Sequence, residues 1–408
     1  MALSVTVPGA NGIVVDLAYD TQSNAALAGQ IAAALQAALT AGTEHAAGNA
    51  SGPPPPLGGR TGLFNQAVSG ATALPRGYND VVDSAANAVI IGSGGANQHI
   101  LAGAGNLTFF ATGGSGVVDT GGGNNLISIP QSDTGNWLIQ LGSGADTVAD
   151  RGTGSDTISP GPGANVVSLG GGQYQIISVG QDTITAGSGS TTVDASGAPA
   201  TASELIYGGS GPLTFIGGAA GATIIGASGS TTVTGGSGPL DARGGADGSN
   251  SLTGGTGGAT LFGAGNGDVL TANGLAPQAL FAGAGSETLT GATATGADTF
   301  AGGAGSDQIT GGLGADTYIG GSGHAVVNAT GASNLFAFID GAAGGSMVVS
   351  DLTSAAQVSI ALIGYGPNEA ANAIASQTPS ANAVTLTLSD NTTITFENIT
   401  HLSGSNVT

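Results

Sequence analysis

The segment Gly302-Gly303-Ala304-Gly305-Ser306-Asp307-Gln308-Ile309-Thr310 is followed directly by Gly311-Gly312-Leu313-Gly314-Ala315-Asp316-Thr317-Tyr318-Ile319. Both nine-residue units read G-G-x-G-x-D-x-U-x, where U is a large apolar residue. Weaker copies occur at residues 142–150, 152–159, 187–194, 254–262, 263–271 and 283–290, and the period extends over roughly residues 88–330. Since one unit holds a glycine-rich turn and a short strand that cannot bury its apolar side alone, successive units are expected to stack.

Stacking of these units predicts an all-β fold, a parallel β-roll or β-solenoid with two units in each coil. One apolar residue of each unit should point inward and stack at the strand spacing of about 4.8 Å. We expect the glycines to serve turns whose backbone alternates between left- and right-handed conformations. The expected inward residues are Val148, Ile158, Val167, Ile184, Val193, Leu213, Ile224, Val233, Leu252, Leu261, Val269, Leu289, Ile309 and Tyr318.

The composition excludes several classes of protein. Glycine contributes 78 of 408 residues, but the clusters have no collagen register. The formal charge of −21, with no lysine and four arginines, disfavours nucleic acid and anionic membrane partners. Charged residues are only 7% of the chain and hydrophobic residues 40%, which favours a folded protein over a disordered one. With no cysteine, disulfides, thiolate zinc sites and thiol nucleophiles are excluded.

Two flanking regions differ from the repeats. Residues 1–85 predict an N-terminal cap region with strands at 3–7 and 13–17, an amphipathic helix at 23–40 capped by Ser23, and a polyproline spacer at 53–56. The helix is expected either to cover the open first coil or to dock on another subunit. Residues 86–330 form the predicted solenoid, and residues 331–408 a β-rich region with a hairpin of strands 384–388 and 392–396.

Acidic residues at the sixth position of the repeat are candidate metal ligands. Carboxylates and turn carbonyls are hard oxygen donors, which suit Ca²⁺ better than Mg²⁺. Ligands on one face should recur about every 18 residues, the separation of Asp298 and Asp316, with Asp307 on the opposite face. The alternative is that these acids only solvate the edges of the solenoid. The candidate calcium ligands are Asp298, Asp307, Asp316, Gly303, Gly305, Gly312, Gly314, Asp268, Glu287, Asp146, Asp156 and Asp182.

Many units lack this acid and carry Ser, Thr, Pro, Gly or Asn in its place. We therefore expect few ions, concentrated near residues 263–323 and 142–185, with the middle held by hydrogen-bonded polar side chains. The remaining acids are expected to keep the surface soluble. The four histidines share no metal-ligand spacing, and Trp137 is expected to be a packed insertion, with a sugar platform as the alternative.

The units at 302–319 resemble the nonapeptide calcium repeats of the repeats-in-toxin (RTX) family. The resemblance implies a β-roll folded by Ca²⁺ after export through a type I secretion apparatus that recognises an uncleaved C-terminal signal. Residues 386–400 are cation-free and β-prone and are similar to such signals, whereas the N-terminal residues show no basic and apolar signal peptide. An extracellular or cell-surface location follows as an expectation.

Family members usually carry an effector domain ahead of the repeats. Residues 1–85 contain no nucleophile and base pattern, no H-E-x-x-H and no phosphate loop, so we expect no enzyme. The leading hypothesis is a secreted structural protein that assembles with itself into filaments, a surface layer or a biofilm matrix, without nucleic acid binding or membrane insertion. The alternative is a monomeric adhesin or a glycan- or ice-binding module, although the threonine pairs at 183/185, 191/192 and 231/232 share no register. A calcium-buffering fragment of a longer protein is a third interpretation.

Overall fold

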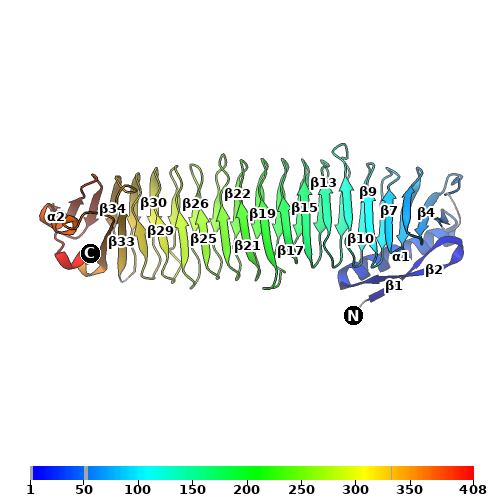
Figure 1. The fold of residues 1–408 in the computed structure, drawn as a ribbon, viewed down its shortest axis with the longest axis horizontal. Coiled ribbons are helices and arrows are strands. Elements are labelled where there is room, and N and C mark those ends of the chain that lie inside the picture. The colour runs from blue at the N-terminus through cyan, green and yellow to red at the C-terminus, as the bar shows by residue number, and fades with distance from the viewer. Residues whose placement is uncertain (1–2, 50–53, 332) are drawn as a thin grey trace. The chain divides into compact units, whose positions relative to one another are not determined.

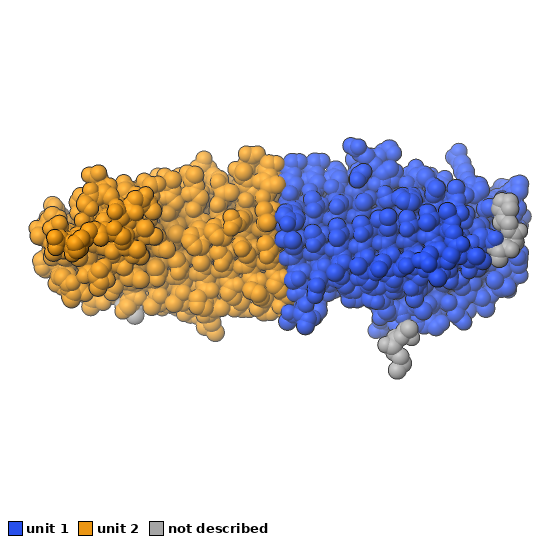
Figure 2. All heavy atoms as spheres, viewed as in Figure 1, with its two compact units in different colours: residues 1–212 blue, residues 213–408 orange. Residues whose placement is uncertain are grey.

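The computed structural model describes residues 3–49, 54–331 and 333–408. The chain forms two compact units, residues 1–212 and 213–408 (Figure 2). In each unit short parallel strands alternate between two facing sheets, which we name the even sheet and the odd sheet after the strand numbers (Figure 1). The predicted fold class, an all-β parallel β-solenoid, is therefore confirmed.

Unit 1 begins with the antiparallel strands β1 (Leu3–Pro8) and β2 (Val14–Tyr19), separated by the 3-10 turn η1 (Ala10–Gly12) and followed by helix α1 (Gln22–Ala41). Its even sheet contains β3 (Glu44–Gly48), β4 (Thr61–Gln66), β6 (Tyr78–Asp83), β8 (Gln98–Ala102), β10 (Gly116–Thr120), β12 (Trp137–Gln140), β14 (Ser155–Ser159), β16 (Gln173–Ile177) and β18 (Thr191–Asp194). Its odd sheet contains β5 (Gly70–Ala73), β7 (Asn87–Ile91), β9 (Asn106–Phe110), β11 (Leu126–Ile129), β13 (Thr147–Asp150), β15 (Ala164–Leu169), β17 (Gln181–Thr185) and β19 (Ser203–Tyr207).

Unit 2 continues the same pattern. Its even sheet contains β20 (Leu213–Ile216), β22 (Thr231–Thr234), β24 (Ser251–Thr253), β26 (Val269–Thr271), β28 (Thr288–Thr290), β30 (Ser306–Thr310), β32 (His324–Asn328) and β34 (Ser346–Ser350). Its odd sheet contains β21 (Gly221–Ile225), β23 (Leu240–Arg243), β25 (Ala259–Phe262), β27 (Gln278–Phe281), β29 (Thr299–Ala301), β31 (Thr317–Ile319), β33 (Asn334–Ile339) and β35 (Val358–Ile363). The last elements are η3 (Ala355–Gln357), α2 (Glu369–Ala375), β36 (Thr378–Pro379), β37 (Ala383–Thr387), β38 (Thr393–Glu397) and η4 (Gly404–Asn406).

The core of each unit consists of apolar side chains stacked in register between the two sheets. In the odd sheet of unit 2, Leu280, Phe300, Tyr318 and Phe336 are in-register partners and fully buried. The rings of Phe300 and Tyr318 stack with centroids 5.6 Å apart, and those of Tyr318 and Phe336 at 5.3 Å. Aromatic stacking thus adds to the apolar burial that holds successive coils together.

One predicted inward residue is wrong. Val269 is 40% exposed, and its neighbour Leu270 is buried between Leu252 and Leu289. Side chains alternate along a strand, so the inward position of Asp268 sends Val269 outward and Leu270 inward. The other thirteen predicted inward residues are buried.

Helix α1 differs from its prediction in its cap and in its position. Thr21, not Ser23, caps the helix, because its hydroxyl accepts the Asn24 N–H, and Gly42 ends it in the left-handed conformation. The helix packs with the β1–β2 hairpin beside successive coils of the even sheet, on Leu63, Val82 and Leu101, instead of only over the first coil (Figure 1).

The parallel ladder extends beyond the predicted repeat block at both ends. Strand β3 pairs with β4 from Glu44 onward, and β33 pairs with β35 after residue 330. The predicted C-terminal hairpin is present as the antiparallel pair β37–β38, and β38 also joins β34 in parallel. Pro53 of the predicted polyproline spacer lies outside the described residues, whereas the carbonyl of Pro55 accepts the Tyr78 hydroxyl at 2.7 Å.

Candidate calcium sites

The sixth-position side chains of unit 2 form two columns, one in each sheet. Each column lies at the N-terminal ends of successive strands and faces the core. In the odd sheet, Asp298 and Asp316 are in-register neighbours, as their spacing predicts, and Asp307 lies in the even sheet. The odd column contains Gln278, Asp298, Asp316 and Asn334, and the even column contains Thr231, Asn250, Asp268, Glu287 and Asp307. All nine side chains are buried, so these acids are not solvating groups at the edge of the solenoid.

One carboxylate oxygen of each aspartate accepts a backbone N–H from the preceding coil, whereas the Oε1 of Glu287 accepts the Gly285 N–H of its own turn at 3.1 Å. The Asp298 Oδ1 accepts from Gln278 at 2.8 Å, the Asp316 Oδ1 accepts from Asp298 at 3.0 Å, and the Asp307 Oδ1 accepts from Glu287 at 3.1 Å. The columns are therefore fixed by the same register that stacks the core.

The second carboxylate oxygens fall into two classes. The Oδ2 atoms of Asp316 and Asp307 accept the N–H groups of Gly312 at 2.8 Å and Gly303 at 3.0 Å within their own turns. The Oδ2 of Asp298 and the Oε2 of Glu287 are buried without a hydrogen-bond partner. A buried anionic oxygen without a partner is costly, so these atoms fit a site that a cation completes.

Each column of unit 2 contains neighbouring carboxylates, and no basic side chain lies in either column. Burial, followed by hydrogen bonding and charge repulsion from Asp307, raises the pKa of Glu287 to about 7. Burial and the charge of Asp316 raise the pKa of Asp298 above its ordinary value. The only basic residue of unit 2 other than histidine is Arg243, whose guanidinium lies 4.4 Å from the ring centroid of Phe262.

The predicted glycines lie where the turns of successive coils approach most closely. A Cβ on Gly303, Gly305 or Gly314 would lie 1.8, 1.4 or 1.8 Å from a carbonyl oxygen of the preceding coil, and one on Gly312 would lie 2.5 Å away. None of these four glycines has a left-handed φ, so the expected alternation of backbone handedness is wrong for them. They are required because a side chain would separate the coils.

Within the described residues, no three His, Asp or Glu side chains are placed to hold one metal ion together. A calcium ion in these columns would therefore use one or two carboxylates and complete its shell with oxygens of the glycine turns, which is the donor set that Ca²⁺ accepts. In unit 2, Asp298, Asp316, Asp307, Glu287 and Asp268 are the residues that would hold it.

Residues 293–327 match the family model described as RTX calcium-binding nonapeptide repeat (4 copies). The chain carries RTX repeats. No curated protein and no solved structure matches the chain. RTX repeats are calcium-binding motifs typical of secreted proteins. No helix in the described part of the chain is long and apolar enough to span a membrane.

Unit 1 has buried columns of its own, made of mixed acids and amides. The Asp146 Oδ1 accepts both the N–H and the Nδ2 of Asn125, at 2.7 and 2.9 Å, while its Oδ2 is buried without a partner. Burial is the largest cause that raises the pKa of Asp146 to about 6. An asparagine accepts the same N–H as an aspartate and also donates to the next carboxylate, so it replaces part of the stabilisation that Ca²⁺ gives.

Asp156 lies in a cluster whose other members the repeat pattern does not mark. Its Oδ1 accepts the Trp137 N–H at 2.6 Å, and the Trp137 Nε1 donates to Asp133 at 2.7 Å. Trp137 is buried against Phe109, so its prediction as a packed insertion holds. Asp133 and Asp150 are buried here too, and their only sequence signal is an acid close to a break in the repeat.

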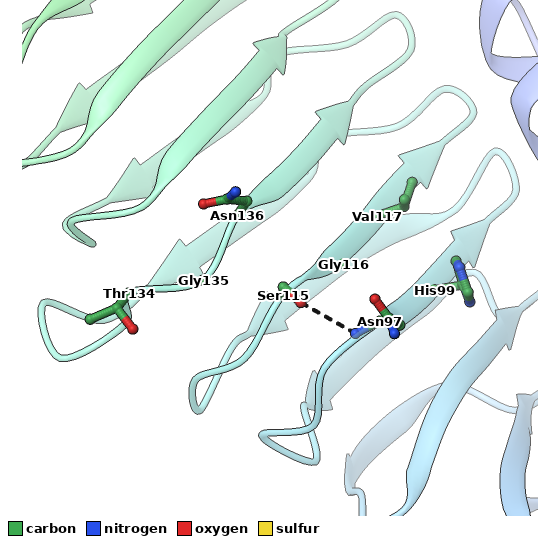
Figure 3. Close-up of a pocket in the computed structure, with 8 residues that line it drawn as sticks. All are labelled: Asn97, His99, Ser115, Gly116, Val117, Thr134, Gly135 and Asn136. Carbon is green, nitrogen blue, oxygen red and sulfur yellow. Dashed lines mark hydrogen bonds between the residues drawn. The ribbon is translucent and has the colours of Figure 1, made fainter.

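A surface hollow of about 550 Å³ lies in unit 1 along the ends of three strands of the even sheet (Figure 3). Its lining contains no carboxylate, and its one titratable group is His99, whose Nδ1 lies 2.6 Å from the Asp80 Oδ1. The backbone N–H of Asn97 donates to the Ser115 hydroxyl across it at 3.3 Å. This donor set does not fit Ca²⁺, and the candidate metal sites are the buried columns.

Proposed function

We propose that this chain is a secreted structural protein whose copies associate side by side through the odd sheet of unit 2, in an extracellular filament, surface layer or biofilm matrix. The supporting observation is an apolar column on the outer face of this sheet. Its in-register members are Ile225, Arg243, Phe262, Phe281, Ala301 and Ile319.

The column is suited to contact a second copy. Ile225 is 37% exposed, and the rings of Phe262 and Phe281 are half-buried and stacked 4.9 Å apart. Soluble monomers rarely keep a contiguous apolar surface of this kind, and such surfaces mark interaction sites. Arg243, stacked on Phe262, is the one charged member of the column.

The distribution of charge also favours association. Sixteen of the 25 acidic residues are buried, and eight of these lie outside the predicted ligand set, so these eight do not keep the surface soluble as expected. Copies of a chain with charge −21 can therefore approach with less repulsion than this number suggests. The buried acids are Glu44, Asp80, Asp83, Asp119, Asp133, Asp146, Asp150, Asp156, Asp182, Glu204, Asp268, Glu287, Asp298, Asp307, Asp316 and Glu369.

In this proposal the chain has no catalytic role, its main partner is itself, and a type I apparatus exports it. Bound Ca²⁺ neutralises the acid columns and makes the solenoid rigid. Neither nucleic acid nor membrane insertion is involved, consistent with the excess of negative charge.

Sedimentation velocity and electron microscopy at high protein concentration test self-association, each with millimolar Ca²⁺ and with a chelator. We expect ordered assemblies in Ca²⁺ that the double variant Phe262→Ser/Phe281→Ser loses. The double variant Thr271→Ser/Thr290→Ser, on the opposite sheet, is the matched control and should assemble. A wild-type protein that stays monomeric under both conditions would refute the proposal.

A second candidate function, binding to a regular surface such as ice, is favoured by one observation. Thr234, Thr253, Thr271, Thr290 and Thr310 lie in register on the outer face of the even sheet, although the threonine pairs considered from the sequence share no register. Their spacing follows the strands at about 4.8 Å. Ice-affinity retention that Thr271→Lys/Thr290→Lys abolishes, with the phenylalanine variant unaffected, would favour this function over assembly.

A further inference from the structure

A second kind of acidic site lies in unit 1, where the predicted ligand Asp182 meets two residues that the repeat pattern does not mark. Asp182 is the second residue of strand β17 and Glu204 lies opposite it in β19, so their side chains enter the core from adjacent strands. Ser178, in the turn before β17, is fully buried beside them. Glu204 follows Thr201-Ala202-Ser203, a segment without any glycine, and lies far from the matched residues 293–327.

The hydrogen bonds of this cluster cannot all be satisfied by protein groups while both carboxylates are ionised. The Ser178 hydroxyl contacts Asp182 Oδ2 and also Glu204 Oε2, the latter at 2.6 Å. A hydroxyl has one proton, so it can donate to only one of two ionised carboxylates. Against the other carboxylate it presents a lone pair to a negative oxygen, which is repulsive unless a positive charge lies between them.

A second observation points to a missing ligand. Glu204 is 3% exposed, and its Oε1 is buried with no hydrogen-bond partner. The remaining Asp182 oxygen is occupied, since Oδ1 accepts the Asn165 Nδ2 at 2.8 Å. Among the described residues the single ion pair is that of His99 and Asp80, so no basic side chain balances this pair of acids.

The turn that carries Ser178 borders a surface hollow. The hollow has a volume of about 330 Å³, and Val179, Gly180, Gln181 and Ala202 line it. Val179 adjoins Ser178, Gln181 adjoins Asp182, and Ala202 lies two residues before Glu204 in the chain. The side chains of Ser178, Asp182 and Glu204 themselves are buried, with exposed fractions of 0, 1 and 3%.

We propose that Asp182 forms a calcium-binding site with Ser178 and Glu204, two ligands that the nonapeptide pattern does not mark. Two carboxylates and a hydroxyl are hard oxygen donors that Ca²⁺ prefers, and the unpartnered Glu204 Oε1 supplies a free ligand position. With the cation present, the hydroxyl donates its proton to one carboxylate and its lone pair faces the ion. The site is independent of self-association and of the RTX repeats in unit 2.

Native mass spectrometry at rising Ca²⁺ concentration tests the site by counting bound ions. Glu204→Gln keeps the shape of the side chain and should bind one ion fewer than the wild type, and Ser178→Ala should weaken the same ion. Asp247→Asn, which removes an exposed carboxylate, is the charge-matched control and should lose none. Asp298→Asn should lose an ion of the RTX repeats instead, which separates the two kinds of site.

Circular dichroism in chelator shows whether each variant is folded before its ions are counted. We expect Ca²⁺ to raise the unfolding temperature of Glu204→Gln less than that of the wild type. An equal ion count for Glu204→Gln and the wild type would overturn the proposal. So would an infrared band of a protonated carboxyl that persists in saturating Ca²⁺ and disappears in Glu204→Gln, because the pair would then share a proton.

Discussion

Replacing Asp316 by asparagine tests whether the acid columns are calcium ligands or only hydrogen-bond acceptors. In the folded protein, Asp316 accepts the N–H groups of both Asp298 and Gly312. An asparagine keeps one acceptor and turns the other into a donor, so Asp316→Asn loses one charge-assisted hydrogen bond, about 1.5–3 kcal/mol of the free energy of unfolding. This loss does not depend on Ca²⁺.

The calcium-dependent part is added to this loss. An ion at 100 times its dissociation constant stabilises the folded state by about 2.7 kcal/mol, which the variant forfeits. For a unit of the size of residues 213–408, each kcal/mol shifts the unfolding temperature by roughly 2–4 °C. In saturating Ca²⁺ we therefore expect Asp316→Asn to unfold roughly 8–23 °C below the wild type.

In chelator the expected shift is about a third to a half as large. The calcium contribution is absent, and removing one of two stacked buried charges relieves the repulsion that raises the pKa of Asp298. Differential scanning calorimetry of the wild type, Asp316→Asn and the exposed-site control Asp247→Asn, each in both buffers, measures the difference. Equal shifts of Asp316→Asn in Ca²⁺ and in chelator would refute a role for this carboxylate in calcium binding.

Three further predictions concern the coils and the N-terminal helix. Gly305→Ala should prevent stacking at its turn and strongly lower the unfolding temperature, because the new Cβ would lie 1.4 Å from the Gly285 carbonyl oxygen. The control Gly366→Ala, whose new Cβ has open space around it, should leave the unfolding temperature unchanged. Gly29→Ala, inside α1 with nothing within 4 Å of the new Cβ, should stabilise the protein by about 0.8–1 kcal/mol in urea unfolding; a destabilised variant would contradict the described packing. Burial raises the pKa of Asp119 from 3.8 to about 8, so the folded protein binds this proton more tightly than the unfolded chain does. The resulting contribution to the free energy of unfolding is present at low pH and is lost as the pH rises from about 4 to about 8. Asp119→Asn should flatten the pH dependence of the free energy of unfolding by up to about 1.4 kcal/mol per pH unit, and an unchanged slope in chelator would count against this burial.

The repeat pattern predicts the fold because each nine-residue period contains one turn and one strand, which is also the unit that stacks to bury the apolar side chains. A turn and a strand every nine residues place Asp298, Asp307 and Asp316 on alternating sheets, and the structure has them there. The pattern is less informative where a unit departs from the consensus. Val269 was expected to point inward because it is apolar, but the alternation set by Asp268 decides its orientation.

Other parts of the candidate sites depend on contacts between distant residues. Asp133 and Asp150 precede breaks in the repeat, and only the stacking of coils brings them near Asp156. In the same way, the register of β17 and β19 places Glu204 opposite Asp182, 22 residues earlier in the chain. Insertions of variable length between units hide such pairs from an analysis of spacing.

The sequence by itself determined that this chain is a parallel solenoid with acids at its turns, because a nine-residue period of glycine and apolar residues has one way to bury its apolar side. The tertiary structure decided which acids are buried, which of their oxygens lack partners, and which threonines and phenylalanines share an outer column. These properties depend on the register between coils. Register is fixed by the hydrogen bonds and core contacts of all the strands together, and no single repeat unit encodes it.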